Sequence, residues 1–150
     1  FERVVVGNTS AADLSKPWER FSTSLLLRLP RVLTADAIDR ERTILQITSN
    51  RSAVDNEPLA RTWADYYREQ TPTRSAFARQ LFAASRSRLP RSITAPVLVL
   101  TSTGDRLVSH RCSENIARAL SAPICVHDQA GHDLTLDAPD WVCDKVACSL

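Results

Sequence analysis

The apolar residues follow two patterns along the chain. Continuous apolar runs near both ends predict strands, and apolar residues at helical spacing between them predict helices. Residues 95–101 form a continuous apolar run rich in Val and Leu, and residues 3–8 and 124–126 contain shorter runs of the same kind. A continuous run is typical of a strand that is buried on both faces of a sheet, with helices on either side. The pattern therefore predicts an α/β fold with three mostly parallel strands, the first two of them buried, and flanking helices.

Between the first two strands the apolar residues recur at helical spacing. Trp18, Phe21, Leu25 and Leu26 predict a helix that begins at Pro17 and ends at Pro30. Three later stripes consist of Ile38 and Leu45, of Leu59, Trp63, Tyr66 and Tyr67, and of Phe77, Leu81 and Ala84. We expect about four helices and no strand over residues 17–88, with the aromatic side chains of the third helix facing the sheet. Because such an insertion is too long for an ordinary crossover, it is typical of a lid or cap.

Two glycine-containing loops follow the second and third predicted strands. Asp105 comes after Gly104 at the end of one strand, and His132 comes after Gly131 beyond the next. Because the carboxyl ends of parallel strands meet at one edge of a sheet, these side chains should lie together, with a carboxylate oxygen about 2.6–3.2 Å from a ring nitrogen. An acid that orients an imidazole base is two-thirds of a nucleophile–His–acid triad. Alone, Asp105 could be an ordinary turn residue and His132 a loop residue without a task.

The remaining histidines and the cysteines indicate no further chemistry. His110 and His127 are interpreted as residues without a catalytic role, and no HxxxH, HxH or CxxC spacing occurs, so we predict no metal site. Of the four cysteines, Cys125 and Cys143 are expected in the core. With no sign of secretion, reduced thiols and a cytoplasmic location are the default.

Composition and charge restrict the partners. The chain has 150 residues, 43% of them hydrophobic, and a net charge of +2, which is ordinary for a globular domain. It contains no apolar run near the roughly 20 residues that a membrane span needs. Residues 61–91 carry seven Arg against two acidic residues, which could meet nucleic acid or an anionic substrate. A solvated face is the favoured interpretation, because no motif that reads a nucleic-acid groove accompanies these arginines. We therefore predict neither a nucleic-acid nor a membrane partner.

Taken in order, these features resemble the C-terminal half of an α/β-hydrolase-fold protein. Residues 4–10 resemble its sixth strand and exit loop, residues 96–108 its seventh strand and acid loop, and residues 124–134 its eighth strand and histidine loop. The resemblance implies a partial hydrolase core at 1–16 and 89–150 and an all-helical cap at 17–88. Since the triad of this family runs Ser, Asp, His along the chain, it also implies that Asp105 is the acid and His132 the base.

The sequence departs from the family in lacking a nucleophile. The motif G-x-S-x-G needs two glycines four residues apart, and the only glycines are Gly7, Gly104 and Gly131. The glycine-bearing oxyanion loop is missing as well. The chain also starts without Met, so we expect an internal fragment or a processed product.

We therefore expect part of a serine hydrolase that cleaves a carboxylic ester or related acyl bond and needs no cofactor. Its partners would be a small acyl substrate and a missing N-terminal half, or second chain, that carries the serine. The isolated chain should be inactive and should self-associate. The alternative is a truncated or degenerate hydrolase half that acts as a non-catalytic binding or interaction module.

Overall fold

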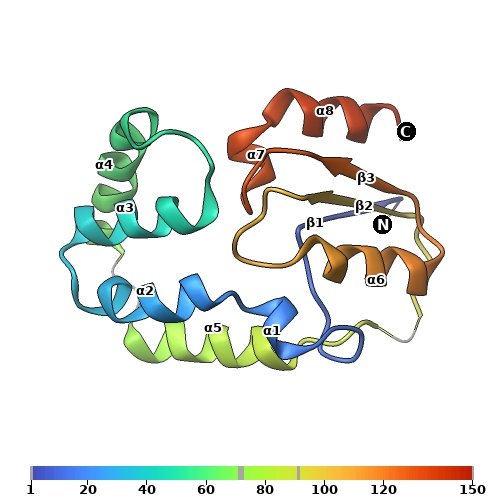
Figure 1. Ribbon diagram of the computed structural model, residues 1–150, viewed down its shortest axis with the longest axis horizontal. Coiled ribbons are helices and arrows are strands. Elements are labelled where there is room, and N and C mark those ends of the chain that lie inside the picture. The colour runs from blue at the N-terminus through green and yellow to red at the C-terminus, as the bar shows by residue number, and fades with distance from the viewer. Residues whose placement is uncertain (1, 71–72, 91, 150) are drawn as a thin grey trace.

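The computed structural model describes residues 2–70, 73–90 and 92–149; residues 71–72 of the expected cap and Arg91 of the Arg-rich segment lie outside the described residues. Three strands and eight helices make up the described chain (Figure 1). In chain order they are β1 (Val4–Gly7), α1 (Pro17–Arg20), α2 (Thr23–Thr34), α3 (Ala37–Thr48), α4 (Ala53–Glu69), α5 (Arg74–Arg86), β2 (Val97–Ser102), α6 (His110–Leu120), β3 (Ile124–His127), α7 (Leu134–Asp137) and α8 (Pro139–Ala147).

The strands form one parallel sheet in the order β1-β2-β3, which confirms the predicted α/β class. Val4 pairs with Val97 on the first side of β2, and Leu100 pairs with Cys125 on the second. β2 is buried over most of its length, as predicted, because it has neighbours on both sides. β1 alternates between half-buried and exposed residues, so the expectation of a fully buried strand is wrong for it; β1 lies at the edge of the three strands.

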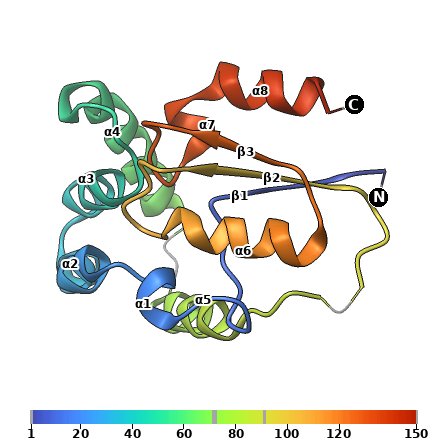
Figure 2. The same cartoon turned by 45° about the vertical axis from the view of Figure 1, so that its right-hand side comes forward.

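Helices cover both faces of the sheet (Figures 1 and 2). Val99 points to one face and packs with Ile116 of α6, whereas Leu98 and Leu100 point to the other face and pack with Trp141 of α8. This alternation follows from the two-residue period of a strand. It explains why residues 97–100 include no polar position: both faces of β2 are covered.

Helices α2 to α5 lie together on the side towards which the strands point (Figures 1 and 2). No strand occurs among the described residues of this span, and it holds five helices rather than about four. α3 packs between α2 and α4, and Asn50, just after its end, is hydrogen-bonded to the chain beyond β2 and β3. The helical segment therefore stands at the edge of the sheet where Asp105 and His132 lie.

The first predicted helix is divided, and its predicted boundary at Pro30 is wrong. The helix is interrupted between α1 and α2, and α2 continues through Pro30. Leu29 and Val32, on either side of Pro30, both line the same cavity, so packing holds the turn although the proline donates no hydrogen bond. Trp18 and Leu26, which were expected on the inner stripe, are 72% and 60% exposed.

The cysteines differ from expectation. Cys112 of α6 is fully buried, Cys125 is partly buried, and Cys143 is exposed rather than in the core. The residues of α8 that pack against the sheet are Trp141 and Val142, so Cys143, which follows them, faces outward. Burial raises the pKa of the Cys112 thiol, so its nucleophilic thiolate is scarce at neutral pH.

Thiol reactivity should follow this burial. With an aromatic disulfide reagent at neutral pH, exposed Cys143 should react promptly and Cys112 only after unfolding. Replacing Cys112 with Ala should leave the fast absorbance phase unchanged and remove one equivalent from the total measured in denaturant. A loss from the fast phase would contradict the burial of Cys112.

An ion pair joins α3 to α4 and should make stability depend on acid pH. Arg42 donates from Nε and Nη2 to the two carboxylate oxygens of Glu57, at 2.8 and 2.6 Å, and these bonds lower the pKa of Glu57 from 4.5 to about 2. Since the folded-state pKa is depressed, the stabilisation is present above the unfolded value and is lost as pH falls from 4.5 towards 2. Urea midpoints measured over this range should fall less steeply for Glu57→Gln than for the wild type. Parallel profiles would rule this contribution out.

Candidate functional site

Asp105 and His132 meet at the carboxyl edge of the sheet. Nδ1 of His132 lies 2.9 Å from Oδ2 of Asp105, within the range expected from the sequence. The other carboxylate oxygen accepts the backbone N–H groups of Leu107 and Val108, at 2.7 and 3.0 Å. The side chain of Asp105 is only 1% exposed, whereas that of His132 is 29% exposed. The carboxylate is thus fixed on three sides, and the imidazole has one accessible edge.

This contact selects a form of the imidazole. An ionised carboxylate accepts hydrogen bonds and donates none, so Nδ1 carries the proton that is shared with Asp105. In the neutral ring Nε2 then has a free lone pair. An imidazole in this form can take a proton from a neighbouring hydroxyl and return it, while the carboxylate stabilises the charged ring.

Asn8 connects the histidine loop to the sheet. Its side-chain N–H groups donate to the carbonyl oxygens of Gly131 and His132, at 3.0 and 2.8 Å. Its carbonyl oxygen accepts the N–H of Ser102 at 2.9 Å. The backbone of Asn8 has a φ of 42°, a left-handed conformation that Asn tolerates better than most residues. One buried amide therefore joins the ends of β1 and β2 to the backbone that carries His132.

The acid loop and the histidine loop also contact one another directly. The hydroxyl of Ser102 donates to the carbonyl of Ala130 at 2.6 Å and accepts the N–H of Gly104 at 3.1 Å. A Cβ at position 104 would stand 2.6 Å from the Ala130 carbonyl and 2.7 Å from that of Gln129. Gly104 is therefore required for the close approach of the two loops.

The end of α3 is hydrogen-bonded to both loops. Asp137 accepts the hydroxyl of Ser49 at 2.6 Å and the N–H groups of Asn50 and Gly131 at 2.7 and 2.6 Å. The side-chain amide of Asn50 donates to the carbonyls of Gly104 and Gln129, at 2.9 and 2.8 Å. These bonds fix the helical segment against the edge that holds the His–Asp pair.

Next to His132 lies a cavity of about 440 Å³ between the helical segment and the sheet. Its wall is largely apolar and includes Leu25, Leu29, Val32, Ile44, Ile47, Phe77, Leu81 and Leu107. Arg20 and His132 are the ionisable side chains among its lining residues. A volume and wall of this kind suit a small ligand with a substantial apolar part.

The other predicted residues lie elsewhere. His110 begins α6, with Nε2 3.9 Å from a carboxylate oxygen of Glu114. Nδ1 of His127 accepts the N–H groups of Gln129 and Ala130 at 3.1 and 3.0 Å, which shapes the start of the histidine loop. Neither histidine lines the cavity.

The aromatic residues that were expected between the helices and the sheet lie elsewhere. α4 packs on α3, so Trp63, Tyr66 and Tyr67 do not line the cavity, and that prediction is wrong. Tyr66 is 63% exposed, and the guanidinium of Arg40 stacks 4.3 Å from the ring centre of Tyr67. Helices α2, α3 and α5 supply the apolar wall instead.

Sequence reasoning missed Asn8, Asn50 and Asp137. Only Asn8 left a local signal, an Asn directly after Gly at the end of a strand, where a left-handed residue often stands.

Among the described residues no group of three or more His, Cys, Asp or Glu side chains could hold a metal ion. Within the same residues no helix has the length and apolar character needed to cross a membrane.

The sequence model of the Alpha/beta hydrolase family matches residues 4–145, so the chain belongs to this family. No curated protein matches it significantly in sequence.

Solved structures share the fold at low sequence identity. An esterase from Exiguobacterium antarcticum superposes with a TM-score of 0.74 at 12% identity, covering 99% of this chain and 56% of its own. The enol-lactonase of Burkholderia xenovorans LB400 gives 0.69 at 20% identity, with coverages of 98% and 55%. An esterase from Rhodococcus sp. ECU1013 gives 0.66 at 13%, with coverages of 98% and 55%. The chain thus spans about half the length of these structures, and the likeness is one of fold.

The close packing around Gly131 can be tested against Gly7. A Cβ at position 131 would lie 2.6 Å from the carbonyl oxygen of Thr48, whereas one at Gly7 would meet only a methyl group of Leu134 at 3.6 Å. Gly131→Ala should therefore lower the free energy of unfolding by about 1–3 kcal/mol, since the atom it meets belongs to the backbone. Gly7→Ala, the matched control, should change it by less than about 1 kcal/mol. Equal urea midpoints for the two variants would contradict the packing described.

Proposed function

We propose that this chain supplies the acid and the base of a serine hydrolase that cleaves a carboxylic ester or related acyl bond. The observation that carries the proposal is the 2.9 Å contact between His132 and a buried Asp105, beside an apolar cavity. Membership of the α/β hydrolase family supports it, as do structural neighbours described as esterases and as an enol-lactonase.

In the proposed mechanism Nε2 of His132 takes the proton of the attacking serine hydroxyl. The serine oxygen bonds to the acyl carbon, and the bond to the leaving alcohol breaks as His132 returns the proton to that alcohol. Water then attacks the acyl-enzyme in the same way and releases the acid and the free serine. Asp105 keeps the proton on Nδ1 and stabilises the imidazolium in both halves of the reaction.

The serine and the oxyanion donors would come from residues outside the sequence given. The outer edge of β1 supports this, because in the described chain β1 pairs only with β2, and Val5 is 39% exposed. A further strand from the nucleophile-bearing half would cover this edge. Without it, an open edge favours self-association.

The helical segment 17–88 would act as the cap. Two observations support this: its helices provide most of the apolar wall of the cavity, and Ser49 and Asn50 are hydrogen-bonded to Asp137 and to Gly104 of the acid loop. A cap of this kind would exclude water from the reacting bond and select substrates with an apolar group. The proposal includes no cofactor, nucleic acid or membrane partner.

The test is hydrolysis of p-nitrophenyl acetate. Residues 1–150 alone should give background release, because a base without its nucleophile and oxyanion donors retains little of the rate. Residues 1–150 combined with a polypeptide that carries the G-x-S-x-G half, or the intact protein from its native source, should be active. In that active form His132→Ala should lower kcat by about 10⁶-fold and Asp105→Asn by about 10⁴-fold.

His110→Ala is the matched control, because His110 lies outside the cavity, and it should retain activity. Robust turnover by residues 1–150 that is insensitive to His132→Ala would refute both roles. Complete inactivity of the intact protein, with ligands still bound in the cavity, would favour a non-catalytic binding module instead.

A further inference from the structure

A second cavity, of about 390 Å³, lies on the other side of α3 from the one beside His132. It is bounded by α2, α3, the start of α4 and the acid loop, and shares no lining residue with the first cavity. Ile44, Ile47 and Thr48 of α3 face the first cavity, whereas Leu45 and Gln46 face the second. The two spaces are therefore separated by the body of one helix.

Four arginines line this second cavity, and three of them lack a carboxylate partner. Arg42 is neutralised by Glu57 and Asp39. None of the ion pairs in the described part of the chain involves Arg28, Arg51 or Arg106.

The three unpaired guanidinium groups come from separate elements. Arg28 donates to the side-chain oxygen of Gln46 at 2.7 Å, and Arg106 donates to the carbonyls of Gln46 and Ser49 at 3.3 and 2.9 Å. Arg51 is exposed, and its guanidinium makes no hydrogen bond within the described residues. Glu57 also lines the cavity, but Arg42 and Arg61 bind its carboxylate. Three further positive charges, on exposed side chains from α2, the α3–α4 connection and the acid loop, therefore remain without a carboxylate partner around the cavity.

The wall also contains a buried polar side chain and the N-terminal end of a helix. Asn56 is 6% exposed, and its Oδ1 has no hydrogen-bond partner. Its orientation follows from Ser49, whose hydroxyl proton goes to Asp137, so that Nδ2 of Asn56 must be the donor to Ser49. Ala53, the first residue of the 17-residue helix α4, also lines the cavity, and this end of the helix carries positive potential.

We propose that this second cavity binds a phosphate monoester. A phosphate group has two charges and three terminal oxygens, which match several guanidinium forks better than one carboxylate does. The cavity is larger than a phosphate ion, which leaves room for the organic part.

The test is calorimetric titration of the intact protein at constant ionic strength with inorganic phosphate, glycerol 3-phosphate and succinate, a dianion without phosphorus. Glycerol 3-phosphate should bind saturably and more tightly than phosphate, and succinate more weakly than both. Arg51→Gln should weaken the binding of both phosphate compounds about tenfold, since it removes one charge-assisted bond. Arg28→Gln, a second variant from another element, should act in the same direction.

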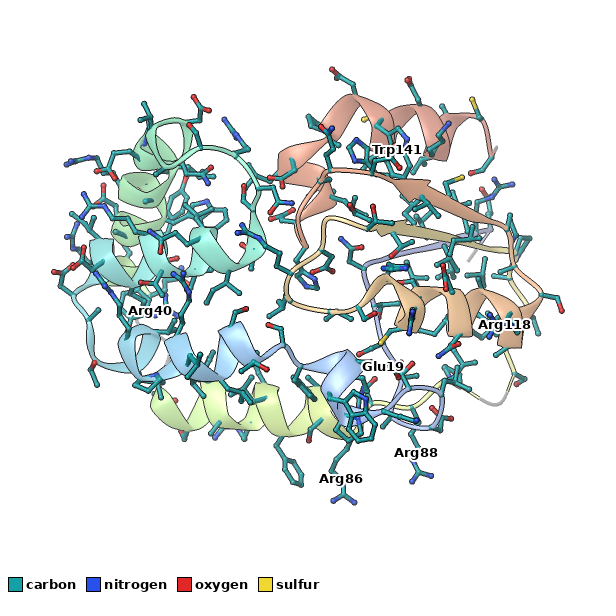
Figure 3. The ribbon with its side chains drawn as sticks, viewed as in Figure 1. Glu19, Arg40, Arg86, Arg88, Arg118 and Trp141 are labelled. Carbon is teal, nitrogen blue, oxygen red and sulfur yellow. The ribbon has the colours of Figure 1, made fainter. Side chains whose placement is uncertain are left out.

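Arg88→Gln is the matched control, because Arg88 is exposed, makes no ion pair in the described chain, and points away from the molecule (Figure 3). It should leave the affinity unchanged. Absence of saturable binding, equal affinity for succinate, or equal weakening by Arg51→Gln and Arg88→Gln would each overturn the proposal. Folding of each variant is checked by its unfolding midpoint without ligand, which should match that of the wild type.

Discussion

The hydrogen bonds of the buried Asn8 side chain hold the site together. They join the ends of β1 and β2 to the carbonyl oxygens of Gly131 and His132, which belong to the peptides before and after the His132 Cα. In a buried site the loss of one partner leaves another polar group unsatisfied, at a cost of about 1–3 kcal/mol, so the network forms as a unit. The direction of the imidazole thus depends on the end of a strand that is more than 120 residues away in the chain.

The helical segment is attached to the same network, and this gives the cavity a defined wall. Asp137 binds Ser49 and Asn50 from the helical side and Gly131 from the histidine loop. Because one carboxylate accepts from both sides, α3 cannot shift without disturbing the backbone next to His132. Its position also separates the apolar cavity from the arginine-lined one.

The fold class and the meeting of Asp105 with His132 could be predicted from the sequence because both follow from local patterns. An uninterrupted apolar run identifies a buried strand, and the order of strands fixes which loops share an edge. The roles of Asn50 and Asp137 could not be predicted, since their contacts span 54 to 88 positions and leave no local pattern. The helix end predicted at Pro30 is wrong for a related reason: the packing of residues on both sides of Pro30 outweighs the tendency of proline to end a helix.

The central claim is that His132 and Asp105 activate a serine that lies outside residues 1–150. It is tested most directly by treating the intact protein with a fluorophosphonate and locating the adduct by peptide mass spectrometry. We expect one labelled serine, within a G-x-S-x-G sequence outside these 150 residues, and loss of labelling in His132→Ala. A labelled serine within residues 1–150, or labelling that persists in His132→Ala, would contradict it.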